Sequence, residues 1–96
     1  MYTIMLQRSA ATDLDTLRRY DAATVADAME RHLRQHPTKE SKSRIKRLRG
    51  IGSPAYRLRV GEYRVFYTVD EGTRRVAVLR VMHKDQTLAY YEELQP

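Results

Sequence analysis

The stretch YRLRVGEYRVFY at residues 56–67 decides the fold, because apolar residues alternate with basic ones along it on both sides of a glycine. A period of two is typical of a half-buried strand. Gly61-Glu62, in the middle, is a Gly-X pair of the kind that a type II′ hairpin turn prefers. The stretch therefore predicts a β-hairpin with strands at Tyr56–Val60 and Tyr63–Val69.

The two-residue turn fixes the register of this hairpin, and the register assigns its side chains to two faces. Arg59 is expected opposite Arg64, and Arg57 opposite Phe66. One face carries side chains suited to packing against helices: Leu58, Val60, Val65 and Tyr67. The other face carries Arg57, Arg59, Arg64 and Phe66. A turn at Asp70–Thr73 and a strand at Val76–Val81 extend this second face with Ala77, Leu79, Val81 and His83.

The rest of the chain predicts helices on both sides of this meander. Alternation at residues 2–7 indicates a short N-terminal strand. Ser9 and Asp21 are expected to cap two helices that form an antiparallel hairpin, and Pro37 stops the second. Asp85 is expected to cap a short C-terminal helix.

Together these elements predict an α+β fold in one domain, residues 1–96. It consists of an N-terminal strand, a helical hairpin on one sheet face, a three-strand antiparallel meander and a short C-terminal helix. The strand at Val76–Val81 is apolar on both faces apart from Arg80, so we expect it in the middle of the sheet.

Composition excludes several classes of protein. Apolar residues are 42% of the chain and charged residues 31%, which is typical of a globular domain. No apolar run reaches the ~18 residues of a membrane span, and the N-terminus lacks the pattern of a secretory signal. The absence of cysteine excludes disulfides, thiolate zinc sites and a cysteine nucleophile, and it fits the cytoplasm.

The charge is concentrated in the middle of the chain. The net charge is +6, yet residues 37–69 alone hold nine basic and two acidic residues, a net +7. Clustered charge of one sign favours a polyanion such as nucleic acid or an acidic protein segment. A solvated surface would spread the excess more evenly.

The opposed arginines favour an anion site on the second face. Like charges directly opposite on paired strands destabilise a sheet by up to ~1 kcal/mol. Arginine is shaped to bind phosphate oxygens with two parallel hydrogen bonds. The alternative is that these long side chains simply extend into water.

These residues resemble a known family. Leu48-Arg49-Gly50, the stretch 56–67, the stretch VLRVMHK at 78–84 and Tyr90 resemble the motifs of RelE/ParE-superfamily toxins of type II toxin–antitoxin modules. The resemblance covers essentially the whole chain. It implies a toxin neutralised by a cognate antitoxin protein. RelE-type members cleave mRNA on the ribosome, and ParE-type members inhibit DNA gyrase without catalysis.

The resemblance to the RelE branch implies a set of catalytic positions: Arg57, Arg59, Arg64, His83, Lys84 and Tyr90. From the basic segment and the second face we expect RNA contacts by Lys46, Arg47, Arg49 and Phe66. Arginine replaces the lysine common at the first two positions, and an arginine cannot act as a general base. The base is therefore left among His83, Lys84 and Tyr90.

The favoured interpretation is a metal-independent, ribosome-dependent mRNA endoribonuclease that uses the 2′-hydroxyl of its substrate. A gyrase inhibitor and a plain nucleic-acid-binding domain are the alternatives. His32 and His36 have a spacing compatible with a metal ion, but no third ligand is evident, so we interpret them as ordinary surface histidines. No cofactor is expected.

Overall fold

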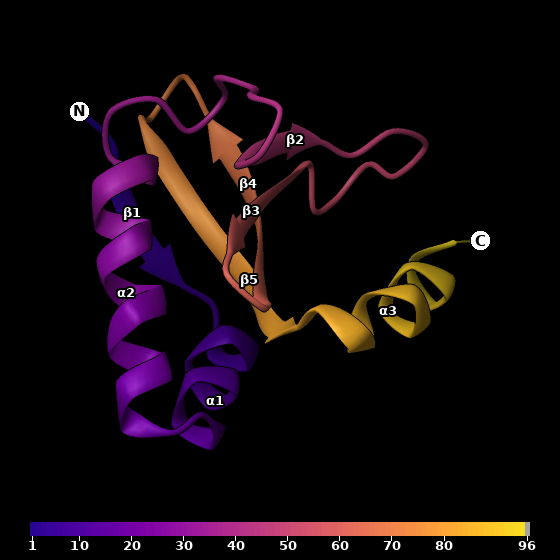
Figure 1. The fold of residues 1–96 in the computed structure, drawn as a ribbon. Coiled ribbons are helices and arrows are strands. Elements are labelled where there is room, and N and C mark those ends of the chain that lie inside the picture. Colours follow the sequence, from indigo (N-terminus) through magenta and orange to yellow (C-terminus); the bar gives the residue numbers. More distant parts are fainter. Residues whose placement is uncertain (96) are drawn as a thin grey trace.

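Over residues 1–95, which the computed structural model describes, the chain folds around a mixed sheet of five strands (Figure 1). The strand order is β1-β5-β4-β3-β2, with β1 parallel to β5 and the other pairs antiparallel. In chain order the elements are β1 (Thr3–Leu6), α1 (Arg8–Thr16), α2 (Arg19–Leu33), β2 (Ile45–Arg47), β3 (Tyr56–Val60), β4 (Tyr63–Asp70), β5 (Arg75–His83), the 3₁₀ turn η1 (Lys84–Gln86) and α3 (Thr87–Leu94).

The predicted α+β class and element order are confirmed, and β5 lies inside the sheet as expected. The strand β2 was missed. It has three residues, and of these only Ile45 is buried, so it shows no period-two pattern. No helix within residues 1–95 is long and apolar enough to cross a membrane.

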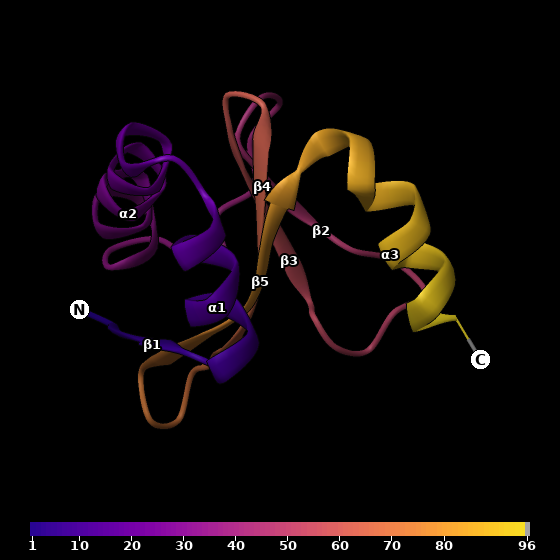
Figure 2. The ribbon, with the colours of Figure 1, turned by 90° about the horizontal axis from the view of Figure 1, so that it is seen from below.

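The helices lie on both faces of the sheet (Figure 2). α1 and α2 cover one face and α3 approaches the other. Under α1 and α2 the main core contains Val25, Met29 and Leu33 of α2 and the predicted helix-facing residues of the hairpin. Tyr67 is fully buried at its centre and donates a hydrogen bond from its hydroxyl to the carbonyl of Pro37 at 2.6 Å. Burial raises the pKa of that hydroxyl.

Part of the second face is covered by α3, which corrects our expectation that Phe66 contacts RNA. Phe66, Met82 and Tyr90 form a smaller core there, with Tyr91 and Leu94 of α3 packed against it. Phe66 is fully buried. With α3 in place, its ring has no free surface on which a base could stack.

The register is as predicted between β3 and β4 but not throughout β4 and β5. Arg59 pairs with Arg64, and Arg57 with Phe66. Ala77 lies on the predicted face, opposite Thr68, but a bulge follows: Phe66 pairs with Arg80 and Tyr67 with Val78, so Leu79 has no partner on β4.

Beyond this bulge the faces of β5 are exchanged. Val81 and His83 pair with Val65 and Tyr63 on the face beneath α1 and α2. Arg80 and Met82 lie on the other face, beneath α3. The placement of Val81 and His83 beside the arginines was therefore wrong.

The three predicted helix caps were also wrong. Ser9 lies inside α1, which begins at Arg8, and its hydroxyl donates to the carbonyl of Leu79 at 2.6 Å. Asp21 lies in the first turn of α2 and accepts a hydrogen bond from the Tyr63 hydroxyl. Asp85 lies within η1, whose capping side chain is His83. Ser9 and Asp21 thus bond to partners far away in the sequence, which no local pattern indicates.

Candidate functional site: a basic groove between the sheet and α3

Three arginines form a cluster on β3 and β4, which we call the arginine cluster: Arg57, Arg59 and Arg64. The hairpin register places Arg59 opposite Arg64, with Arg57 two residues away on the same face of β3. Within residues 1–95 none of the three forms an ion pair with a carboxylate. The cluster therefore carries positive charge that the described part of the chain does not neutralise.

The environment of Arg64 shows the cost of this arrangement. Burial lowers the pKa of its guanidinium below its usual value, and the positive charges of Arg57 and Arg59 lower it further. The Arg64 guanidinium donates to the carbonyl oxygens of Gly61 and Tyr63, both at 2.9 Å. The backbone thus holds Arg64 in place beside two other cations.

Arg57 has a donor without an acceptor. Its Nε is buried and has no hydrogen-bond partner within residues 1–95. Buried polar groups are almost always hydrogen-bonded, so an unpaired donor of this kind needs an explanation. An anion bound beside Arg57 would accept this hydrogen bond and offset the repulsion within the cluster.

A groove of about 440 Å³ adjoins the arginine cluster. We call it the basic groove. It lies between β2, β3 and α3, and among its lining residues are Lys46, Arg47, Arg49, Arg57, Leu88 and Tyr91. Lys46 pairs with Arg57 across β2 and β3, so two more cations are neighbours here. The structure thus brings together one predicted catalytic arginine and three predicted RNA contacts.

Among these cations, Arg47 is the one with a side-chain partner in the described residues 1–95. Its guanidinium donates to the Tyr56 hydroxyl at 3.0 Å and lies 5.4 Å from the centre of that ring. Lys46 and Arg49 are exposed. The free cations of the groove are therefore supplied mainly by β2 and the segment that follows it.

Tyr91, which the sequence analysis missed, lines the basic groove, and Tyr90 does not. The Tyr91 ring meets Phe66 edge-on at 5.8 Å and stays partly exposed. Adjacent helix residues point about 100° apart, so only one of the two tyrosines can face the groove. The rotation of α3 about its own axis relative to Phe66 decides which tyrosine faces the groove. This rotation depends on tertiary packing, so the sequence alone did not identify Tyr91.

Tyr90 is buried on the β5 side of α3. Its ring centre lies 4.9 Å from that of Phe66 and 5.6 Å from the guanidinium carbon of Arg80. Burial raises the pKa of the Tyr90 hydroxyl, although the charge of Arg80 opposes this. In this arrangement Tyr90 holds α3 on the sheet, away from the basic groove.

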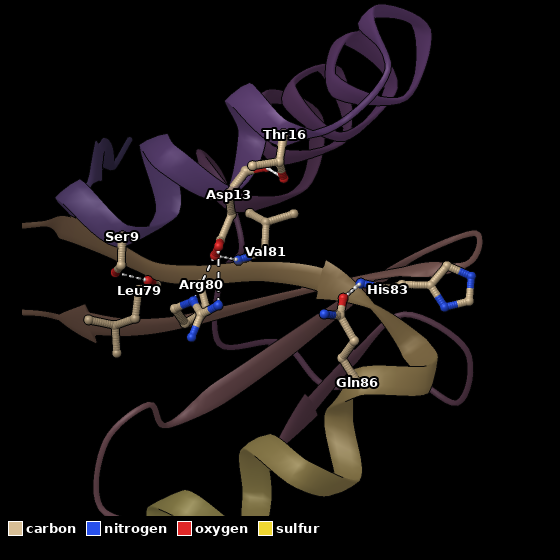
Figure 3. A network of polar contacts seen from close by, with 8 residues as sticks. All are labelled: Ser9, Asp13, Thr16, Leu79, Arg80, Val81, His83 and Gln86. Carbon is tan, nitrogen blue, oxygen red and sulfur yellow. Dashed lines mark hydrogen bonds and ion pairs between the residues drawn. The ribbon is translucent and has the colours of Figure 1, made fainter.

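Arg80 differs from the arginine cluster because it has a carboxylate partner (Figure 3). Asp13 of α1 accepts two hydrogen bonds from its guanidinium, at 2.7 and 3.1 Å, and a third from the backbone N–H of Val81 at 2.8 Å. Asp13 raises the pKa of Arg80. This pair joins α1 to β5 and leaves no free charge on Arg80 for a ligand.

His83 and Lys84 lie near the turn of the hairpin rather than in the basic groove. The His83 ring meets Tyr63 edge-on at 5.7 Å, and its Nδ1 accepts from the backbone N–H of Asp85 at 3.1 Å. Lys84 forms an ion pair with Glu62 at 2.9 Å. Arg64 also reaches this turn, since its guanidinium donates to the carbonyl of Gly61, and the backbone N–H of Lys84 donates to the carbonyl of Glu62 at 2.7 Å.

The donor set of the groove suits an anion. Within residues 1–95 no group of three histidine, aspartate or glutamate side chains is placed to hold a metal ion. The polar side chains of the lining are three guanidinium groups, one ammonium group, one tyrosine hydroxyl and the amide of Gln95, and the remaining lining residues are apolar. Such donors bind the oxygens of phosphate or carboxylate groups.

Solved structures of toxins share this fold. The archaeal RelE–RelB complex from Pyrococcus horikoshii matches with a TM-score of 0.70 and 23% identity, over 86% of this chain and 94% of that one. The RelBE2 toxin–antitoxin complex from Mycobacterium tuberculosis gives 0.66 and 28%, over 85% and 96%. The isolated E. coli RelE toxin gives 0.71 and 18%, over 98% and 100%.

Sequence comparison identifies the family. A search of curated proteins finds no significant match. The sequence model described as ParE toxin of type II toxin–antitoxin system, parDE, matches residues 4–88. With the structural neighbours and the hairpin motif, this match shows that the chain belongs to the RelE/ParE superfamily of type II toxins.

Proposed function

We propose that this toxin cleaves mRNA on the ribosome. The observation that carries the proposal is the arginine cluster: three guanidinium groups without a carboxylate partner within residues 1–95, one of them with a buried, unpaired Nε donor. A phosphodiester would supply the missing acceptors. The site of action would be the cytoplasm, where translating ribosomes are found.

The chemistry needs little beyond positioned charge. The substrate's own 2′-hydroxyl attacks the adjacent phosphorus, the bond to the 5′-oxygen breaks, and a 2′,3′-cyclic phosphate remains. Negative charge grows on the non-bridging oxygens, where preplaced donors are most effective. Arg57, Arg59 and Arg64 would supply them, since arginine stays protonated throughout.

Proton transfer is assigned to groups beside the cluster. Tyr91 lines the same groove as Arg57, so its hydroxyl would position the 2′-hydroxyl, whose proton passes to solvent water as the bond to phosphorus forms. A phosphate near the hairpin turn could draw Lys84 away from Glu62 and bring an ammonium to the leaving oxygen. His83 would serve there as an alternative, and Tyr90 would keep α3 in place.

The test is cleavage of mRNA in a reconstituted translation reaction. Arg64→Ala should lower the cleavage rate about 10²- to 10³-fold, as removal of one preplaced donor does elsewhere. Arg75→Ala, which removes an exposed arginine at the start of β5, is the matched control and should cleave normally. An mRNA with a 2′-deoxy nucleotide at the cleaved position should resist. Full activity of Arg64→Ala would contradict the assignment.

We also propose a cognate antitoxin as partner. Two of the structural neighbours are complexes of RelE-type toxins with their antitoxins. The excess of +7 over residues 37–69 would attract an acidic segment that folds on binding. Co-expression with the small protein encoded next to this gene should restore growth and give a complex that purifies together.

Inhibition of DNA gyrase is the second candidate, because the matching family model is that of ParE toxins. In that case purified chain should block supercoiling by gyrase and leave translation unchanged. Loss of translation with normal supercoiling would support the nuclease. The two assays on one preparation therefore separate the candidates.

A further inference from the structure

A second basic cavity, of about 250 Å³, lies between the end of α2 and the loop that leads to β2. We call it the loop cavity. The residues of its lining that matter here are His32, His36, Lys39, Ser41 and Arg44. Glu40 is the one carboxylate among the lining residues, and its Oε1 accepts from the backbone N–H of Arg47 at 3.0 Å.

Several donors in the loop cavity are free. Lys39 and Arg44 form no ion pair within residues 1–95. The Ser41 oxygen accepts from the backbone N–H groups of Arg44 at 3.1 Å and Ile45 at 3.3 Å. Its lone pairs are thus used by the loop, and its hydroxyl hydrogen remains to donate to a ligand.

The positive charges around the loop cavity also act on His32. Burial lowers the pKa of His32, and the nearby charges of Arg44 and Arg31 lower it further, while Asp27 opposes them. Arg31 itself is paired with Asp27 at 2.6 Å. A bound anion would relieve this repulsion.

The loop cavity and the basic groove meet β2 from opposite faces of the sheet. Ile45 lines the cavity, and the next residue, Lys46, lines the groove. β2 is an edge strand, and the loop uses its free backbone groups: the backbone N–H of Ser41 donates to the carbonyl of Ile45 at 2.9 Å, and the Glu40 carboxylate accepts from the backbone N–H of Arg47. The edge is therefore closed to another strand, and a flexible polyanion can cross it from one basic site to the other.

We infer that the loop cavity binds a second backbone phosphate of the same RNA strand whose scissile phosphate lies at the arginine cluster. This inference rests on the proposed function. A hydroxyl, an ammonium and a guanidinium around a small cavity suit a tetrahedral phosphate. The position next to the groove favours a continuous strand over a separate acidic protein segment.

The experiment measures binding rather than cleavage. The full-length chain is titrated with fluorescent single-stranded 2′-O-methyl RNA, in which the 2′-oxygen cannot attack. Oligonucleotides of about four and about twelve nucleotides bracket the lengths that such grooves hold. Affinity is measured by anisotropy over a range of salt concentrations.

Arg44→Ala should lower the affinity for the longer RNA and reduce its salt slope by about 0.7, the value for one phosphate contact on a single strand. It should leave binding of the shorter RNA unchanged. Lys42→Ala is the matched control, because it removes one charge from the same loop but does not line the cavity. Its salt slope should equal that of the wild type.

Equal effects of Arg44→Ala and Lys42→Ala would overturn the inference, since only general charge would then matter. Unchanged RNA binding of Arg44→Ala together with weaker binding of polyglutamate would overturn it in favour of an acidic protein. Arg57→Ala separates the two proposals. If it weakens RNA binding while Arg44→Ala does not, only the loop cavity fails; if neither does, the proposed function fails as well.

Discussion

The two hairpins of the sheet differ in how far local sequence controls them. The β3–β4 hairpin has clean alternation and a two-residue turn, and every predicted pair forms. The β4–β5 hairpin keeps the predicted face as far as Ala77 and then changes register at Leu79. Residues 76–82 are apolar on both faces apart from Arg80, so alternation there carries no information on register.

The bulge coincides with contacts from α1, which is distant in sequence. Ser9 donates to the carbonyl of the unpaired Leu79, and Asp13 binds Arg80 and the backbone of Val81 (Figure 3). Beyond Val78, where β1 ends its pairing, these side chains take the place of a neighbouring strand. A strand such as β5, with apolar residues on both faces, therefore takes its register from tertiary contacts.

The largest difference in stability between the two hairpins is expected when one residue is deleted from each. Deletion of Leu58 moves one half of β3 to the wrong face, so we expect loss of the folded state. Deletion of Leu79 leaves the pairs Phe66–Arg80 and Tyr67–Val78 in a regular ladder and loses mainly the Ser9 hydrogen bond, about 1 kcal/mol. Urea unfolding followed by circular dichroism measures both. Equal damage from the two deletions would contradict this account of the bulge.

Phe66→Ala should have the next largest effect. Phe66 is fully buried between the sheet and α3, and such truncations cost about 3–5 kcal/mol. A Phe66 ring exposed for contact with RNA, as expected from the sequence, would instead give almost no loss. Tyr20→Ala, at a ring that is 80% exposed, is the control and should leave the free energy of unfolding nearly unchanged.

Asp13→Asn should cost about 1–3 kcal/mol, because it weakens charge-assisted hydrogen bonds to Arg80 at a partly buried site. Asp15→Asn removes the same charge from an exposed position two residues along α1 and should have little effect. Chemical denaturation of the two variants measures the difference. Equal stabilities would show that Asp13 does not support β5.

Glu62→Gln should give the smallest effect on stability, and the pH dependence of unfolding should reveal it. The hydrogen bond and charge of Lys84 hold the pKa of Glu62 below its usual value of 4.5. Since the folded pKa is the lower one, the stabilisation is present above pH 4.5 and is lost as the pH falls through the folded pKa. Thermal unfolding of wild type and Glu62→Gln should therefore converge in acid. Glu92→Gln, at an exposed position, should follow the wild type.

The candidate site was predictable where it lies on the regular hairpin. Arg57, Arg59 and Arg64 share a face as the turn requires. His83 was misplaced because the bulge at Leu79 lies between it and the Asp70–Thr73 turn, from which its face was predicted. Tyr91 was missed because the sequence of α3 does not show which of two adjacent tyrosines faces the sheet.

Local sequence was sufficient to predict the α+β class, the order of the main elements, the β3–β4 register and the concentration of positive charge, since each depends on neighbours along the chain. It was not sufficient for the bulge at Leu79, the covering of Phe66 by α3 or the pairing of Arg80 with Asp13. These depend on contacts between residues far apart in sequence. Their energies come from burial and from partners that no local pattern identifies.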